Sequence, residues 1–234
     1  MDKQALREAV WDELEASGTA RFPFPPHGRI PNFVGAEAAG DRLAATDAWR
    51  DASVLKANPD APQLPLRRRA LHEGKTVYMA VPRLASEHPF YELDPERLDA
   101  ADYDAAATVS KVERYADTVA VDALESVDLV LSGSVAASEE GARVGKGEGY
   151  SDLEWAVLAI EDIVDDDTTV ATTAHESQVR SVPEPDAHDV PIDVVCTSER
   201  TICTETPYAR PEGIDASLLD DERVDEIPVL QDRI

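Results

Sequence analysis

Three glycines at alternate positions, Gly145, Gly147 and Gly149, lie among residues that could bind phosphate. Glycine reaches positive φ without penalty and lets a ligand approach the backbone closely, so this spacing excludes an ordinary helix or strand. Arg143 and Lys146 add positive charge beside the free N–H groups of the loop. Exposed N–H groups with neighbouring cations form an anion site, and we therefore predict phosphate binding here rather than a plain glycine-rich connection.

The glycine loop has a predicted strand before it and a predicted helix after it. Residues 127–133 form a mainly apolar run typical of a buried strand, and residues 152–164 have the spacing of a helix. A helix that begins after a basic glycine loop favours phosphate at its N-terminus. The loop matches neither the dinucleotide fingerprint G-x-G-x-x-G nor the phosphate-binding motif G-x-x-x-x-G-K-[ST]. Phosphate binding is thus predicted without a standard nucleotide motif.

A second group of polar residues follows a strand predicted at 168–174. It gathers two of the five histidines, His175 and His188, with carboxylates that include Asp189 and Asp193. The spacing of zinc ligands is absent, whereas Mg²⁺ requires only one or two carboxylates beside a phosphate. Like the glycine loop, this segment lies at the carboxyl end of a strand, where such sheets bind ligands. The segment is either a magnesium site or an acidic loop with a turn histidine.

The first helix is predicted at residues 2–17, because Leu6, Val10 and Leu14 recur every four residues. Lys3 and Arg7 share one face of its first turns. From the residues alone, this pair is most simply a solvated helix face. Only five of the 22 basic residues are lysine, however, so we expect lysine to be retained where an ammonium group is needed.

The composition restricts the class of protein. The chain of 234 residues has 48 Asp and Glu against 22 Lys and Arg, a formal net charge of −26. Such spread acidity is expected of a haloarchaeal protein, because concentrated salt shortens the Debye length and suppresses self-repulsion. It argues against binding to nucleic acid or to an anionic membrane. With neither a long apolar run nor a signal-peptide pattern in the sequence, we expect a cytoplasmic protein.

The rest of the pattern alternates strands with helices. Further helices are predicted at 34–45 and 65–74, and further strands at 52–57, 76–81, 118–121, 190–197 and 201–204. Residues 83–126 carry little other pattern. This alternation predicts an α/β fold in which helices cover both faces of a mostly parallel sheet.

Three expectations concern packing. The arginines at 67–69 are expected on the surface, because three successive helical positions point in three directions. Cys196 and Cys203 lie on neighbouring predicted strands, where they could face each other, and are expected to be reduced core residues. Residues 1–206 are expected to form a single domain, and residues 207–234 an acidic extension that packs on it.

Three blocks of the chain resemble the 5-formyltetrahydrofolate cyclo-ligase family, also called methenyltetrahydrofolate synthetases. The first block is K-x-x-x-R from Lys3 to Arg7, and the second is the strand at 127–131 with the loop from Gly141 to Asp152. The third comprises Gln178, Pro183, His188, Asp189 and Asp193. The run Lys-Gly-Glu-Gly-Tyr-Ser-Asp-Leu-Glu is most similar to a diverged branch, the methenyltetrahydrofolate synthase domain-containing proteins.

The resemblance implies a three-layer α/β/α sandwich and an ATP- and Mg²⁺-dependent reaction that converts 5-formyltetrahydrofolate to 5,10-methenyltetrahydrofolate. It implies that Lys3 and Arg7 hold ATP phosphates and that Asp152 and Asp189 hold Mg²⁺. The residues implied to wrap the nucleotide are Arg143, Gly145, Lys146, Gly147, Gly149 and Tyr150, with Arg143 and Lys146 also catalytic.

The Gly-Ile-x-Glu-Pro block that helps to bind folate in the family is not found in this sequence. One alternative is therefore an ATP-binding member of the family with another substrate or a regulatory role. Another is an RNA-associated module by analogy with the diverged branch, which the acidic surface disfavours.

Overall fold

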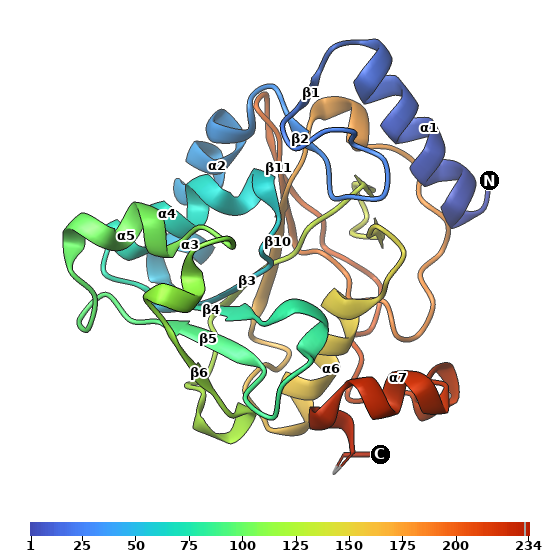
Figure 1. The fold of residues 1–234 in the computed structure, drawn as a ribbon. Helices are drawn as coiled ribbons and strands as arrows, with labels where there is room; N and C mark the ends of the chain where they lie inside the picture. Colours follow the sequence, from blue (N-terminus) through green and yellow to red (C-terminus); the bar gives the residue numbers. More distant parts are fainter. Residues whose placement is uncertain (232) are drawn as a thin grey trace.

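The computed structural model describes residues 1–231 and 233–234, and an eight-stranded sheet lies at its centre (Figure 1). The parallel pairs are β3 with β4, β3 with β7, β7 with β10 and β10 with β11, and the remaining edge strands join antiparallel. The predicted mostly parallel sheet is confirmed. Its strands, in spatial order, are β12 (Thr201–Cys203), β11 (Val194–Cys196), β10 (Thr169–Thr173), β7 (Leu129–Leu131), β3 (Val54–Ala57), β4 (Thr76–Ala80), β5 (Phe90–Leu93) and β6 (Asp117–Val119).

Helices cover both faces of this sheet, because successive residues of each buried strand point to opposite sides. Leu129 and Leu131 pack in one core, whereas Val130 between them packs in the other with Trp155. The helix on the Val130 face is α6 (Tyr150–Ile160). The opposite core includes side chains from α2 (Ala36–Ala44), α3 (Asp47–Asp51), α4 (Leu64–His72) and α5 (Tyr103–Ala106). The α/β/α sandwich is thereby confirmed.

The expectation that residues 67–69 all lie on the surface is wrong for Arg67. Its side chain is 1% exposed and donates to the carbonyls of Asn58 at 2.7 Å, Asp60 at 3.0 Å and Ala107 at 3.0 Å. Asn58 and Asp60 follow β3 and Ala107 follows α5, so their carbonyls have no strand partners and the guanidinium satisfies them. Burial lowers the pKa of Arg67 to about 10.

The first helix, α1 (Lys3–Ala16), begins after Asp2, whose carboxylate accepts from the N–H of Ala5 at 2.7 Å. Its buried face, which includes Leu6 and Val10, packs against a small hairpin of β8 (Ala136–Ala137) and β9 (Arg143–Val144). This hairpin separates β7 from the glycine loop, which sequence reasoning had placed directly after the strand. Another short pair, β1 (Ala20–Arg21) and β2 (Asn32–Phe33), follows α1.

The cysteine prediction is half correct. Cys196 is buried, but Cys203 is exposed. In the antiparallel register Cys196 is paired with Thr201 and Cys203 with Val194, so the two thiols do not face each other directly.

The chain ends in α7 (Asp221–Glu226) and a short turn. Ile227, Val229 and Leu230 are buried in the same core as α6. Within the described part of the chain, no helix combines the length and the apolar character that a bilayer crossing requires.

Candidate functional site

The glycine loop connects β9 to α6. Gly147 has φ of +107° and Gly149 has φ of +71°, conformations that L side chains rarely adopt. Gly149 is the residue that precedes the helix, and Tyr150 begins it. The predicted glycine loop before a helix is therefore present, with its backbone turned by two of the three predicted glycines.

Helix α1 places Arg7 against this loop. The Nε of Arg7 donates to the carbonyl of Gly145 at 2.7 Å, and a Cβ at Gly147 would lie 3.3 Å from the guanidinium carbon of Arg7. Loss of solvation lowers the pKa of Arg7. The negative charge of Asp189 opposes this shift, whereas the positive charge of Arg143 adds to it. Two guanidinium groups close enough to repel each other favour an anion between or beside them.

Lys3, four residues before Arg7, contacts the polar segment that follows β10 and contains Asp189. Its ammonium donates to Asp186 at 2.7 Å and to Asp189. Burial opposes protonation of Lys3, but the hydrogen bonds to the two carboxylates prevail and raise its pKa. The simplest sequence interpretation, a solvated face for Lys3 and Arg7, is therefore wrong, because both residues bridge to segments far along the chain.

Arg143 connects the loop to a predicted metal ligand. It is 4% exposed, pairs with Asp152, and donates to the carbonyl of Gly133 at 2.9 Å. Among the described residues its buried Nε has no hydrogen-bond partner. An unsatisfied buried donor is rare and favours a ligand acceptor at this place.

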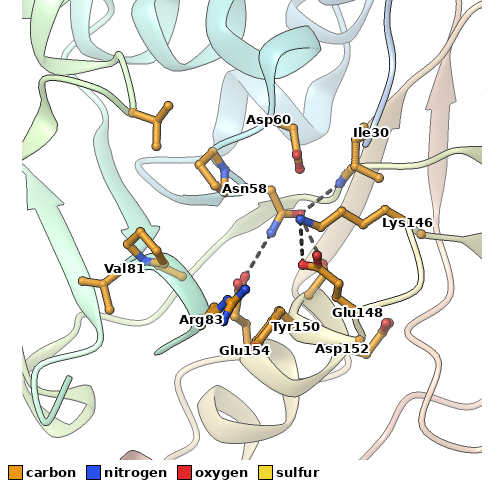
Figure 2. A pocket seen from close by; sticks show the side chains of 18 of the residues that line it. Ile30, Asn58, Asp60, Val81, Arg83, Lys146, Glu148, Tyr150, Asp152 and Glu154 are labelled. Atoms are coloured by element: carbon orange, nitrogen blue, oxygen red, sulfur yellow. Dashed lines mark hydrogen bonds and ion pairs between the residues drawn. The ribbon is translucent and has the colours of Figure 1, made fainter. Parts of the chain in front are cut away.

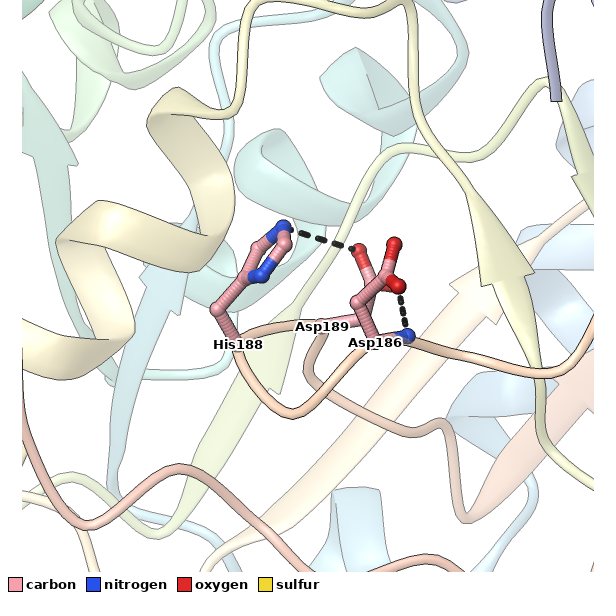
Figure 3. A group of neighbouring side chains, drawn as sticks. All are labelled: Asp186, His188 and Asp189. Atoms are coloured by element: carbon pink, nitrogen blue, oxygen red, sulfur yellow. Dashed lines mark hydrogen bonds and ion pairs between the residues drawn. The ribbon is translucent and has the colours of Figure 1, made fainter. Parts of the chain in front are cut away.

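Asp152 also joins the two halves of the site. Its carboxylate accepts from the N–H of Val190 at 3.0 Å, next to the second predicted metal ligand, Asp189. Figure 3 shows Asp189 with Asp186 and His188, and their ligand atoms lie within 4.8 Å of one another. Oxygen donors of this type suit Mg²⁺, and the Lys3 ammonium contacts the carboxylate of Asp189 where a cation would be attracted. The carboxylates of Asp186 and Asp189 thus fit Mg²⁺ beside the glycine loop, whereas Asp152 lies outside this cluster and pairs with Arg143.

Lys146 extends from the loop over a cavity of about 420 Å³, where it pairs with Glu148 at 2.7 Å (Figure 2). A larger cavity of about 1180 Å³ adjoins it. The two share residues from several segments, namely Ile30, Pro59, Asp60, Val109 and Lys146.

Asp60 faces these cavities and was missed in the sequence, where Asn58-Pro-Asp was assigned only to a turn. Loss of solvation raises its pKa to about 6, against the attraction of Lys146 and Arg67. A C-β at Gly133 would lie only 2.7 Å from the Asp60 carboxylate, so this glycine makes room for it. Such a shifted carboxyl in a cleft is a feature of functional sites.

Glu154 lines the cavity of about 420 Å³ and forms a buried ion pair with Lys56; Glu154 is 5% exposed and Lys56 is 1% exposed. Asn58 donates to Glu154 at 3.0 Å and accepts from the N–H of Gly133 at 3.0 Å. The scarcity of lysine was the one signal in the sequence that could have identified Lys56.

The curated relatives are methenyltetrahydrofolate synthase domain-containing proteins. The chain is 38% identical to that of Bos taurus and 39% to that of Mus musculus, each over 99% of this chain. It spans only 61% and 63% of those two proteins, respectively. Among solved structures, the fold is similar to the solution structure of Aquifex aeolicus 5,10-methenyltetrahydrofolate synthetase, with a TM-score of 0.55 and 18% identity. That match covers 89% of this chain and 96% of the other.

The model of the 5-formyltetrahydrofolate cyclo-ligase family matches residues 1–198. This range includes α1, the glycine loop and the carboxylate segment, and it ends before α7. The chain therefore belongs to the 5-formyltetrahydrofolate cyclo-ligase family.

Proposed function

We propose that this protein is an ATP- and Mg²⁺-dependent cyclo-ligase that converts 5-formyltetrahydrofolate to 5,10-methenyltetrahydrofolate. The observation that carries the proposal is the convergence of Arg7, Arg143 and Lys146 on one glycine loop beside Asp152 and Asp189. A cationic loop with adjacent carboxylates suits a metal-bound polyphosphate. Family membership supports the type of reaction.

The chain's residues contribute mainly charge and position, which are the principal requirements of phosphoryl transfer. Arg7 and Arg143 stabilise the negative phosphate oxygens, while Lys146 reaches from the loop toward the cavity. Asp152 and Asp189 would hold Mg²⁺, and Lys3 would then be released toward the phosphates. When bound, Mg-ATP supplies the phosphoryl group that makes the formyl oxygen a leaving group, so that the neighbouring nitrogen can close the ring.

The folate in this proposal binds in the cavity of about 420 Å³, which Lys146 of the glycine loop lines. This cavity opens beside Lys146, so a substrate oxygen there would be close to the loop that holds phosphate. The Asp60 carboxylate can accept hydrogen bonds from the amino and ring N–H groups of a pterin. The cavity is lined largely by polar and charged residues, and the apolar side chains of Ile30, Val81 and Val109 add the contact with a ring that is typical of ligand pockets.

The test is formation of methenyltetrahydrofolate from 5-formyltetrahydrofolate and Mg-ATP in molar KCl. Lys146→Ala is expected to lower kcat/KM at least about a hundredfold, because one stabilising group of a transition state is lost. Lys111→Ala, at an exposed lysine outside the site, is the matched control and should retain activity. Asp152→Asn is preferable to Asp152→Ala, because it keeps a partner for buried Arg143. Full activity in both Lys146→Ala and Asp152→Asn would contradict the proposal.

A second candidate is a family member that binds ATP but acts on another substrate. The missing Gly-Ile-x-Glu-Pro block favours it, because that block helps to bind folate in the family. It predicts ATP binding that no reduced folate strengthens or weakens, measured by calorimetry in the same buffer.

A further inference from the structure

The residues after the family match form one wall of a cavity beside the glycine loop. This cavity of about 280 Å³ lies between α6 and the C-terminal segment, defined here as residues 207–231. Its apolar lining comes from both sides, with Leu153 and Ala156 on α6 and Ile214, Leu218 and Leu219 on the C-terminal segment. The cavity also touches Gly149 and Asp152, so it opens where the helix N-terminus meets the proposed phosphate site.

Arg223 of α7 links this wall to the loop. Its Nη2 donates to the carbonyl of Glu148 at 2.6 Å, and its guanidinium lies 4.8 Å from the centre of the Tyr150 ring. The Nε of Arg223 is buried and has no hydrogen-bond partner within the described part of the chain. A buried donor left without an acceptor at the edge of a cavity points to a ligand that supplies one.

The chemistry of the lining suits a flat heteroaromatic ring. The cavity is slightly smaller than the ~300–1,000 Å³ typical of sites for drug-sized ligands, which fits a single ring system. Adenine offers ring nitrogens as acceptors and an exocyclic amine as donor. Arg223 can donate to the first, and the carboxylate of Asp215, which also lines the cavity, can accept from the second.

We propose that this cavity binds the base of the nucleotide whose phosphates the glycine loop holds. The inference rests on the proposed function and extends it, because it makes the C-terminal segment part of the nucleotide site. The proposed folate cavity and the base cavity then adjoin each other at the loop, because both include Gly149 and Asp152.

The experiment compares the binding of Mg-ATP and of Mg-tripolyphosphate, which has the phosphates but no base, by calorimetry in molar KCl. Ala156→Leu fills the cavity from α6. Leu218→Asp places a charge in its wall at a residue that is 53% exposed, so folding is not at risk. Each variant is expected to weaken ATP at least about tenfold while tripolyphosphate changes less than about twofold.

Unchanged ATP affinity in Leu218→Asp and in folded Ala156→Leu would overturn the inference. Equal weakening of ATP and tripolyphosphate would also overturn it, because the variants would then act on the loop and not on the base. If Mg-ATP binds normally but 5-formyltetrahydrofolate binding is what falls, the cavity belongs to the other substrate. Wild-type protein that binds neither phosphate probe would overturn the proposed function, and this inference with it.

Discussion

At the scale of single residues, most of the few lysines form specific polar contacts with carboxylates or backbone carbonyls. Lys3 and Lys146 pair with carboxylates at the proposed phosphate site, and Lys56 pairs with Glu154 beneath the cavity. Lys75 is buried and donates to the carbonyls of Trp49 and Ala52. Lys111 is exposed. A chain that uses arginine on its surface has thus kept four of its five lysines at specific contacts.

Asp60 gives a prediction of pH dependence. Its folded-state pKa of about 6 exceeds the ordinary value of 3.8, so between these values the native state binds more protons than the unfolded state. Wild-type stability therefore loses this contribution as pH rises from about 4 to about 6. Asp60→Asn removes this titration. The free energy of unfolding of Asp60→Asn minus that of wild type should therefore increase by about 1–3 kcal/mol from pH 4 to pH 7.

Urea unfolding of both proteins in molar KCl at the two pH values measures this difference. A difference between Asp60→Asn and wild type that stays the same at pH 4 and pH 7 would show that the carboxyl titrates normally.

Arg67 gives a prediction of stability with a control next to it. Arg67→Met leaves the carbonyls of Asn58, Asp60 and Ala107 without their donor, and should lower the free energy of unfolding by about 3 kcal/mol. Arg68→Met removes a half-exposed side chain of the same helix that pairs with Asp104, and should lower the free energy of unfolding by less than about 1 kcal/mol. Chemical denaturation of both variants provides the comparison, and equal losses would be evidence against a special role for Arg67.

At the scale of elements, the loop conformation depends on Gly147. Gly147→Ala places a Cβ at φ of +107° and within 3.3 Å of the Arg7 guanidinium, so it strains the loop and displaces a proposed phosphate ligand. We expect Mg-ATP affinity to fall about tenfold or more. Gly74→Ala is the control, since Gly74 has φ of +78° but no atom within 4 Å of a Cβ.

Calorimetry and unfolding curves separate the two effects. Both variants should lose stability, and only Gly147→Ala should lose affinity for Mg-ATP. Normal affinity in Gly147→Ala would contradict the importance of the loop conformation.

The elements that the sequence predicted are those with strong local patterns. The apolar spacing of Leu6, Val10 and Leu14 predicted α1, and the run before the glycine loop predicted β7, because burial of one face imposes a period on the residues. Strand β5 was not predicted, since it lies at the antiparallel side of the sheet within a polar, proline-containing stretch. Arg67 was misassigned because its partners are backbone carbonyls, which leave no mark on the sequence.

The candidate site, like the fold, was predicted from the sequence only in part. Its glycines and flanking cations were visible as a local motif. The contacts of Arg7 with Gly145 and of Lys3 with Asp189 join residues more than 130 positions apart, and only the resemblance to the family suggested them. Asp60 and Glu154 were missed because their significance comes from burial beside a cavity, and burial of a carboxylate cannot be recognised from residue type.

At the scale of the whole molecule, the net charge of −26 should make stability depend on salt. Ion pairs such as those of Arg200 with Glu139 and Glu176 neutralise only part of the acidic surface. Raising KCl from about 0.1 M to about 2 M shortens the Debye length from ~10 Å to less than ~3 Å and screens the remaining repulsion. The melting temperature, followed by circular dichroism, should rise by at least about 10 °C. A melting temperature that stays constant or falls would contradict adaptation to concentrated salt.

The proposed reaction also belongs to the whole molecule, because the proposed folate cavity, the glycine loop and the carboxylates come from segments along most of the chain. The most direct test is to measure ADP and 5,10-methenyltetrahydrofolate in one reaction of the full chain with 5-formyltetrahydrofolate and Mg-ATP in molar KCl. We expect the two products to form in equal amounts and both to be lost in Lys146→Ala. Folded, ATP-binding protein that forms no methenyltetrahydrofolate would contradict this expectation.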